Sequence, residues 1–343
     1  MPDCALEFGI RMATLTDIAK KLDISVSLVS KVLNDKLGTT GARPELIASI
    51  RETAVEMGYQ RNSSARALRL GRHDAVGIFI HHFGRPGCGS VDSLLQGVSA
   101  EAKLCNQRFI LDYFENAEEF LALKDFTNKS IMDGLLLGGL MHEELLQPLL
   151  ALQATGMPVV TIFDKEISPL LPNVSFDQVE MGRIATEHLI LQGCRKIAHI
   201  VDFEERYEGY RSALGQNDLP HEETRVYHEG GAVFSYDRGH RAARFLLETQ
   251  ADFDGFVAQS DEEAMGVMNV LLESGVHIPA DVRIIGMDNA PYCNFAPVPL
   301  SSVSQSGAKR GRIAFEMLMS LIDGKPVESV TIPPRLFVRE STA

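Results

Sequence analysis

The sequence predicts an all-α head at the N-terminus followed by a much larger α/β body with parallel, doubly wound sheets. At 343 residues the chain is longer than a single core usually organises, so we expect two or three folding units. The net charge of −13 is unevenly distributed, because residues 12–73 carry ten Lys and Arg against six Asp and Glu, whereas residues 74–343 carry 22 against 38. From residue 75 onward, short apolar runs alternate with amphipathic stretches of helical length. A basic helical head is therefore expected on an acidic α/β body.

Composition narrows the class of protein. Hydrophobic residues make up 45% of the chain and charged residues 23%, and no apolar run approaches the length that crosses a bilayer. The N-terminus lacks the basic and apolar segments of a secretory signal, so we expect a cytoplasmic protein without membrane contact. Met12 directly precedes the first helix signal, which predicts a disordered tail over residues 1–11 and leaves Met1 and Met12 both open as the start. No metal site is expected from the scattered cysteines, which are Cys4, Cys88, Cys105, Cys194 and Cys293.

The head carries the signals of three short helices. Thr14 and Asp17 match a capping box at the start of the first helix, and Ser25 is placed to cap the second. The third is bracketed by Pro44 at its first turn and by Gly58 as a left-handed stop. Two short helices joined by a tight turn and braced by a third form a helix-turn-helix, the motif that places its second helix in the DNA major groove.

The second helix has an outward face suited to close contact. That face is small and uncharged apart from one lysine, and consists of Val26, Ser27, Ser30, Lys31 and Asn34. A face that serves only solubility normally carries several charged residues, whereas small side chains permit close approach to another surface such as the major groove. A generic helical bundle with a basic linker is the alternative interpretation. We expect the helix-turn-helix domain to span residues 12–60.

Residues 61–73 form a separate basic segment. They contain four arginines and no acidic residue. A helix this short is marginal in isolation, so this segment is predicted to be a hinge helix or linker.

The segments TLTDIAKKLDISVSLVSKVLN and GYQRNSSARALR resemble the head of the lactose/galactose repressor family (LacI/GalR), and the resemblance continues through nearly the whole chain. It implies a homodimeric repressor that binds double-stranded DNA at a near-palindromic operator. In that family the second helix reads the major groove, and the hinge helix orders on DNA with paired leucines wedged into the minor groove. The DNA-contacting residues that it implies are Thr14, Leu15, Thr16, Ser25, Val26, Ser27, Ser30, Lys31, Asn34, Asn62, Ala65, Leu68 and Arg69.

Two features of the head depart from the family pattern. Residues 36–43 make a longer connection before the third helix than is usual, and Lys31 stands where an arginine is common. Lysine cannot form the bidentate fork that arginine makes to guanine, so the operator sequence stays open.

The body shows two successive series of strands. Apolar runs at 75–80, 109–114, 134–139 and 159–164 form the first series, and runs at 197–202, 224–230, 255–260 and 283–288 form the second. Helical patterns lie near residues 179–193, 206–217, 236–250 and 261–275. This repetition predicts two similar lobes rather than one wide sheet. We expect an N-lobe of about residues 74–173 plus 304–330 and a C-lobe of about residues 174–303 plus 331–343, which together form an effector-binding and dimerisation domain.

An enzyme is the main alternative for such a body, namely a cytoplasmic α/β enzyme that acts on a sugar or nucleotide and carries a fused DNA-binding head. Residues 84–89, which follow the first strand, match neither GxGxxG nor GxxxxGK[ST]. No GxSxG or HExxH pattern occurs elsewhere. The sequence therefore predicts a non-enzymatic protein without a cofactor.

Ligands of parallel sheets bind beyond the carboxyl ends of strands, where several polar residues fall in this sequence. The resemblance makes the body similar to periplasmic sugar-binding proteins, with the ligand held between the lobes. Residues 206–214 resemble the family's RxxGxxxAL segment, whose arginine holds the ligand, and Asp164 and Asp288 match its two lobe aspartates. The effector contacts that the resemblance implies are His81, Phe83, Asp164, Arg206, Phe234, Ser260, Asp288 and Gln305.

Carboxylates and a guanidinium suit a polyol, because they can bond several hydroxyl groups at once. A sugar is therefore expected, while a purine or nucleoside stays open. His81 replaces a common serine or threonine, and Ser260 begins SDEEAMG where NDxxAxG is more usual, so the identity of the effector is not fixed by the sequence. A structural role is the alternative for Arg206, which can also cap its helix or pair with Glu205. The sequence does not determine whether the effector induces or corepresses, or whether dimers pair further.

Substitutions in the head test the predicted DNA contacts. Lys31→Ala should weaken operator binding and leave the fold intact, because it removes a cationic side chain from the reading face. Leu68→Ala should reduce specific binding more than non-specific binding, because the wedge acts on a deformed operator. The measurement is the operator affinity of both variants. Affinities equal to that of the unmodified protein would contradict the assignment of Lys31 to the DNA-reading face and of Leu68 to the minor-groove wedge.

Overall fold

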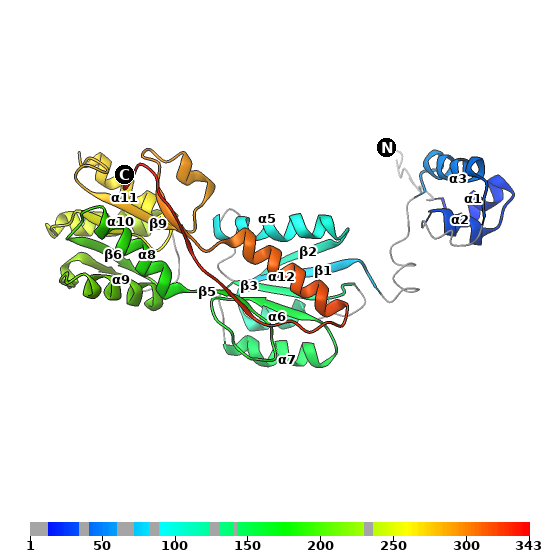
Figure 1. Ribbon diagram of the computed structural model, residues 1–343, viewed down its shortest axis with the longest axis horizontal. Coiled ribbons are helices and arrows are strands. Elements are labelled where there is room, and N and C mark those ends of the chain that lie inside the picture. The colour runs from blue at the N-terminus through cyan, green and yellow to red at the C-terminus, as the bar shows by residue number, and fades with distance from the viewer. Residues whose placement is uncertain are drawn as a thin grey trace, which may run out of the picture. The chain divides into compact units, whose positions relative to one another are not determined.

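The computed structural model describes residues 13–33, 41–59, 72–81, 89–123, 131–139, 143–229 and 236–343. The chain divides into two compact units, residues 1–71 and residues 72–343 (Figure 1). The first unit is helical and the second is α/β, as the sequence predicts.

The head consists of α1 (Leu15–Leu22), α2 (Val26–Leu33) and α3 (Pro44–Glu56). Its core is a single cluster in which Ile18, Val29 and Ile50, one from each helix, are fully buried. The predicted capping box is confirmed: the amide of Asp17 donates to Thr14 Oγ1 at 3.3 Å, and the amide of Thr14 donates to Asp17 Oδ2 at 2.9 Å. These short helices gain most of their stability from the shared core, because isolated helices of this length are marginal.

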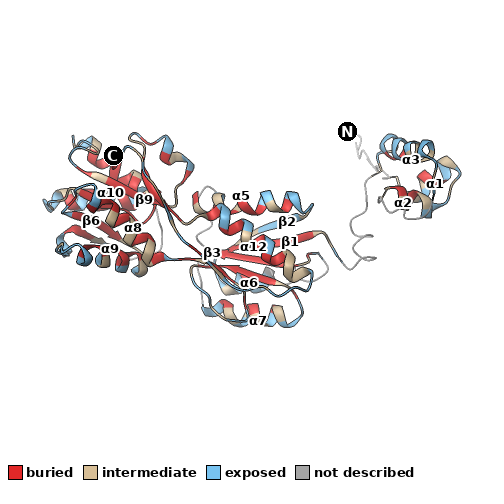
Figure 2. Cartoon of the chain, viewed as in Figure 1, coloured by how far each residue is buried: buried red, intermediate tan, exposed pale blue. Residues whose placement is uncertain are grey.

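The N-lobe of the second unit is a parallel sheet covered on both faces. Within the described residues its order is β2-β1-β3-β4, with β1 (Ala75–His81), β2 (Arg108–Phe114), β3 (Leu135–Gly139) and β4 (Val159–Ile162). One face packs against α5 (Gly89–Leu104) and α12 (Gly307–Ile322), and the other against α6 (Ala117–Leu123) and α7 (Leu146–Ala154), which follows the short 3-10 helix η1 (Glu143–Leu145). The strands β1, β3 and β4 are buried along nearly their whole length, whereas β2 is an edge strand with exposed residues (Figure 2).

The C-lobe repeats this arrangement with a wider sheet. Its order in the described chain is β12-β10-β9-β8-β6-β7, with β6 (Ile197–Val201), β7 (Val226–His228), β8 (Gly255–Val257), β9 (Arg283–Met287), β10 (Ser301–Ser304) and β12 (Arg335–Phe337). One face is covered by α8 (Gln178–Leu191) and α9 (Glu204–Gln216), and the other by α10 (Tyr236–Glu248) and α11 (Asp261–Glu273). Short 3-10 helices precede β7 and follow β9, at η2 (Glu223–Arg225) and η3 (Pro291–Asn294).

Four strands lie outside the runs that the sequence predicts, namely β5 (Val174–Phe176), β10, β11 (Val330–Ile332) and β12. β12 pairs with β10 in the antiparallel direction, whereas a wholly parallel sheet was expected. An antiparallel edge strand can be added without a crossover helix, so this short C-terminal segment completes the sheet. β5 and β11 pair with each other in parallel and form a separate small sheet. Unlike the equally short β7 and β8, these two strands lie outside the two series of apolar runs that the sequence shows.

Pairs of helices in the body approach closely because glycines face the neighbouring backbone. A Cβ atom on Gly182 of α8 would lie 2.0 Å from the carbonyl oxygen of Arg206 in α9, and one on Gly209 of α9 would lie 2.0 Å from that of Val179. The same arrangement joins α10 to α11, where a Cβ atom on Gly239 would lie 1.9 Å from the carbonyl oxygen of Glu263. The helices therefore have no room for a methyl group at their crossings.

Gly182→Ala should destabilise the body, because the added methyl group would displace the backbone of α9. Overpacking of this kind costs about 1–3 kcal/mol, which lowers the thermal midpoint by several degrees. Gly215→Ala is the matched control, since a Cβ atom on Gly215 of the same helix pair meets nothing within 4 Å. The control should keep or raise the midpoint through its better helix propensity. Equal midpoints for the two variants in thermal unfolding would contradict the close-contact interpretation.

Candidate functional site

Residues from both lobes of the second unit interact electrostatically at the carboxyl ends of the strands. Asp164 follows β4 of the N-lobe, whereas Asp202 and Asp288 follow β6 and β9 of the C-lobe. The guanidinium of Arg206 interacts with all three carboxylates and with Glu263. The structure thus brings three of the sequence-predicted effector residues, Arg206, Asp164 and Asp288, into one electrostatic environment. This is the edge of parallel sheets at which ligands bind.

Arg206 lies in the first turn of α9 and is only 2% exposed. Its Nε donates to Gln178 Oε1 at 2.6 Å and its Nη1 donates to the carbonyl oxygen of Gln259. The guanidinium carbon lies 5.0 Å from the centre of the Phe203 ring. Burial lowers the pKa of this guanidinium, and the surrounding carboxylates, Asp288 foremost, oppose that effect. Its orientation is therefore fixed by α8 and by the end of β8.

Asp288 and Gln305 are directly joined. Asp288 has a left-handed backbone, with φ 106°, and its amide donates to the carbonyl oxygen of Val303 at 2.9 Å. Its Oδ1 accepts a hydrogen bond from Nε2 of Gln305. Burial raises the pKa of this carboxyl, while Arg206 and the hydrogen bond from Gln305 lower it. Two of the predicted residues thus form a hydrogen-bonded pair: Asp288, which follows β9 of the C-lobe, and Gln305, which lies in the segment between β10 and α12.

Asp164 has an oxygen that the described part of the chain leaves without a hydrogen bond. This atom, Oδ1, is buried, although the residue as a whole is half-buried. A buried carboxylate oxygen is costly unless a donor reaches it, so a ligand hydroxyl or a water molecule is the expected partner.

Two other predicted residues have structural contacts. Ser260 caps α11, because its Oγ accepts a hydrogen bond from the amide of Glu263 at 3.1 Å. His81 is buried at the end of β1, where its Nε2 lies 3.1 Å from the carbonyl oxygen of Glu115 and its ring centre 5.0 Å from that of Phe114. Both residues lie at the carboxyl ends of strands. The other two predicted effector contacts, Phe83 and Phe234, lie outside the described residues.

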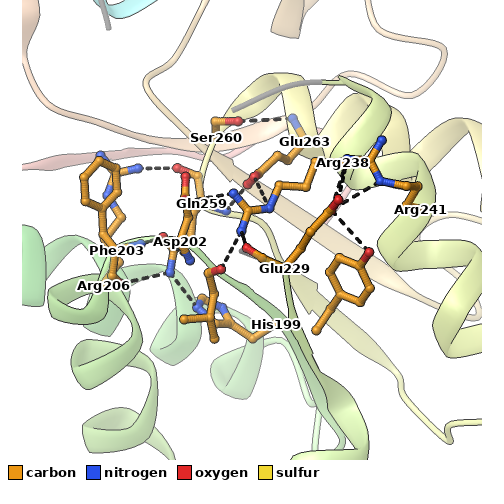
Figure 3. Close-up of polar contacts among 12 residues, drawn as sticks. His199, Asp202, Phe203, Arg206, Glu229, Arg238, Arg241, Gln259, Ser260 and Glu263 are labelled. Atoms are coloured by element: carbon orange, nitrogen blue, oxygen red, sulfur yellow. Dashed lines mark hydrogen bonds and ion pairs between the residues drawn. The ribbon is translucent and has the colours of Figure 1, made fainter. Parts of the chain in front are cut away.

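A buried network at the end of the C-lobe sheet extends this site (Figure 3). Arg238 of α10 forms an ion pair with Asp202 at 2.8 Å, and its Nη2 donates to the carbonyl oxygens of Val201 and Glu229 at 2.9 and 2.7 Å. Its Nε lies 3.8 Å from Oε1 of Glu263, a fully buried residue. Asp202 is the last residue of the predicted run 197–202, whereas the sequence analysis missed Arg238, because no local pattern connects residues on separate elements.

Gln259 completes the network. Its Nε2 lies 3.0 Å from the Nε2 of His199, and its Oε1 accepts from the amide of Asp202 at 3.2 Å. Burial lowers the pKa of His199 to about 3, so this imidazole is neutral at physiological pH. Burial raises the pKa of Glu263 to about 8, and the nearby Asp202 carboxylate adds to the effect. The network is thus a set of fixed donors and acceptors with little net charge at neutral pH.

The head presents its predicted DNA contacts at the start of two helices. The side chains of Thr14 and Thr16 are exposed and Leu15 is half-buried at the start of α1. Ser25, which precedes α2, and Val26 and Ser27 in its first turn are exposed, and Ser30 and Lys31 farther along α2 are half-buried. Ser25 also caps α2, since its Oγ accepts from the amide of Leu28 at 3.2 Å. The remaining predicted contacts, Asn34, Asn62, Ala65, Leu68 and Arg69, lie outside the described residues.

The described residues contain neither a candidate membrane-spanning helix nor a candidate metal site. None of their helices combines the length and the apolar character that a bilayer crossing requires. They also contain no group of three or more His, Cys, Asp or Glu side chains that is arranged to hold a metal ion.

Comparisons with known proteins give consistent results. Residues 186–342 match the family of periplasmic binding protein-like domains. The chain is 29% identical to the ribose operon repressor of Halalkalibacterium halodurans over 344 aligned positions, which cover 96% of this chain and 97% of that protein. A solved complex of the transcriptional regulator CelR with cellobiose is 28% identical, covers 96% of this chain and 99% of its own, and has a TM-score of 0.68. The lac repressor dimer bound to operator and an anti-inducer shares the fold, with 19% identity, the same two coverages and a TM-score of 0.79.

The buried carboxyl of Glu263 predicts a measurable pH dependence of stability. Its pKa is raised from 4.5 to about 8 in the folded chain, so folding favours the protonated form. The stabilising contribution is complete below pH 4.5, declines as the pH rises and is lost above about pH 8. Glu263→Gln removes this ionisation, and its thermal midpoint should fall less than that of the unmodified protein between pH 5 and pH 8.5.

Glu273→Gln is the control for this measurement. Glu273 is exposed at the other end of α11, so its variant should follow the unmodified protein across the pH range. An identical pH profile for Glu263→Gln and Glu273→Gln would contradict a raised pKa at Glu263.

Proposed function

Since the chain belongs to the lactose/galactose repressor family and is a DNA-binding transcriptional regulator, we propose that a sugar bound between its two lobes controls its affinity for an operator. One observation carries the assignment of the site: Asp164 follows a strand of the N-lobe and Asp288 follows one of the C-lobe, and Oδ1 of Asp164 is buried without a hydrogen-bond partner in the described residues. A ligand held there contacts both lobes, so it can favour one arrangement of the lobes over another.

The donors and acceptors of this site suit a neutral polyhydroxy compound. Asp164 contributes a buried carboxylate oxygen that needs a donor, and Asp288 and Gln305 contribute further polar atoms. Arg206 supplies a planar set of donors for sugar oxygens. The complex of CelR with cellobiose shows that a regulator 28% identical to this chain binds a sugar. We propose the contacts at His81, Phe83, Phe234 and Ser260 as further members of this site.

The head supports an operator contact through α2. Val26 and Ser27 are exposed and small enough for close approach to base edges, and Lys31 adds a positive charge. We propose that two copies of the chain read two half-sites of a near-palindromic operator, as the symmetry of a dimer requires. The regulator acts as a repressor in this proposal, and it works in the cytoplasm, where its DNA target lies.

The edge strand β2 supports a homodimer. Its residues Phe109, Ile110 and Leu111 are 36–38% exposed. A strand edge with exposed apolar side chains is prone to association unless a partner covers it. We propose that a second copy of this chain covers it.

The proposal also holds that the chain is not an enzyme. Its relatives over 96% of its length are transcriptional regulators. The guanidinium groups of Arg206 and Arg238 are buried in the candidate site and are held by hydrogen bonds and an ion pair. This arrangement serves ligand recognition.

The thermal midpoint of the full chain against a panel of cellobiose, D-ribose, sugar phosphates and purines tests the effector site. A ligand at 100 times its dissociation constant adds about 2.7 kcal/mol, which raises the midpoint by several degrees. Arg206→Ala should abolish the shift. Arg211→Ala, a change on the same helix at an exposed arginine that pairs with Glu204, should retain it.

Operator binding with and without the active compound then gives the sign of control, with DNA selected from a random pool by the full chain. A shift by a purine alone would replace the sugar by a nucleobase effector. No shift by any compound would remove sugar control and leave the DNA-binding assignment in place.

A further inference from the structure

In the described residues the chain passes between the two lobes at three places (Figure 1). The first crossing runs from the end of β4 through β5 to α8, the second joins β10 to α12 at Gln305 and Ser306, and the third runs from β11 to β12. The first and third lie side by side, because β5 pairs with β11. Any change in the arrangement of the lobes has to be absorbed by dihedral changes in these segments.

Arg310, in the first turn of α12, binds the first crossing through its guanidinium. Its Nη2 donates to the carbonyl oxygens of Ile162 and Phe163 at 3.3 and 3.2 Å. The carbonyl oxygen of Val174 in β5 accepts from both Nε and Nη2, at 3.3 and 3.2 Å. The guanidinium carbon also lies 4.3 Å from the centre of the Phe176 ring. One side chain therefore contacts the end of β4 and both end residues of β5, Val174 and Phe176.

The charge of Arg310 is buried without a direct carboxylate partner. The residue is 5% exposed, and none of the ion pairs within 4.0 Å in the described residues includes it. Asp164 and Asp288 act on it from farther away, and burial lowers its pKa to about 9. Burying a cation costs free energy, so a side chain needed only to fill this space would be apolar. The hydrogen bonds to the crossings are the compensation that the structure provides.

Gln305 connects Arg310 to the effector site. Nη1 of Arg310 donates to Oε1 of Gln305 at 3.1 Å, and Nε2 of Gln305 donates to Oδ1 of Asp288. Because a guanidinium can only donate and a carboxylate can only accept, the amide has one orientation that satisfies both neighbours. Arg310 therefore fixes the side chain that holds Asp288.

We propose that Arg310 is a positioning residue that transmits occupancy of the effector site at Asp288, through Gln305, to the first two lobe crossings. This inference rests on the proposed function, because it requires a ligand at Asp288. A ligand that bonds to Asp288 or Gln305 changes the hydrogen bond that Arg310 makes to the amide. The other donors of the same guanidinium hold β4 and β5, so ligand-free and ligand-bound states differ in how strongly these segments are held.

The first test compares Arg310→Met with Arg312→Met in the full chain. Arg312 lies two residues farther along α12, is 47% exposed and pairs with Glu316, so its variant is the matched control. The measured quantity is the ratio of operator dissociation constants with and without cellobiose, or the panel compound that raises the thermal midpoint most. A coupled regulator has a ratio of about 5–150-fold. We expect Arg310→Met to bring the ratio close to one, whereas Arg312→Met keeps the ratio of the unmodified protein. An unchanged ratio in Arg310→Met would overturn the proposal.

The second test needs no ligand. Thermal midpoints are measured for Arg310→Met, Asp288→Asn and the double variant. Residues coupled through Gln305 should give a double variant whose loss differs from the sum of the two single losses, whereas Arg312→Met combined with Asp288→Asn should be additive. Additive losses in both pairs would overturn the proposal. If no compound of the panel binds, the proposed function fails but this cycle still decides whether Arg310 and Asp288 are coupled.

Arg310→Lys covers the case in which the methionine variant does not fold. Lysine keeps the charge but lacks the planar fork that reaches several acceptors at once. It should therefore keep the fold and lower the operator ratio. A lysine variant with the ratio of the unmodified protein would show that charge alone is sufficient and would overturn the positioning role.

Discussion

Buried guanidinium groups at the carboxyl ends of the strands impose the strongest constraint on this structure. Arg206, Arg238 and Arg310 are 2%, 2% and 5% exposed. A guanidinium cannot lose its charge at physiological pH, so its donors have to meet acceptors wherever it is buried. Each of the three is bound by carbonyl, amide or carboxylate oxygens from different elements, and these elements are thereby held in place around the site.

Each of the three arginines connects a different set of elements in the body. Arg238 ties the ends of β6 and β7 together within the C-lobe, and Arg206 ties α9 to α8 and β8. Arg310 binds the segments that pass between the lobes. The first two make the C-lobe a fixed half of the site, which the glycine contacts of α8 with α9 and of α10 with α11 reinforce. We therefore expect any change on ligand binding to occur mainly in the crossings.

Several buried polar atoms near the ends of the strands have no hydrogen-bond partner among the described residues, and Oδ1 of Asp164 is the one that lies in the N-lobe at this site. Asp288 is bonded to Gln305, and Asp202 is bonded to Arg238. A ligand that supplies one donor to Oδ1 of Asp164 would satisfy that oxygen. In the proposed function, a neutral ligand therefore acts through hydrogen bonds.

The sequence by itself determined the features that depend on neighbouring residues. The capping box of Thr14 and Asp17, the alternation of strands and helices and the basic charge of the head are all local, and the structure confirms the first two. The resemblance of residues 206–214 to a family segment identified Arg206, and the end of β9 identified Asp288. The sequence did not predict the short strands β5, β10, β11 and β12, which lie outside the two series of apolar runs and are defined by their pairing partners.

Only the tertiary structure decided which polar groups meet. Arg238 binds Asp202 on another element, Arg310 binds the carbonyl oxygen of Val174, which is 136 residues away, and Ser260 serves as a helix cap. Such contacts depend on how the lobes fold and where the chain crosses between them, and backbone carbonyls are acceptors that every residue type provides. A sequence can therefore show that an arginine is present, but the acceptors that offset the cost of burying its charge are brought to it by the fold.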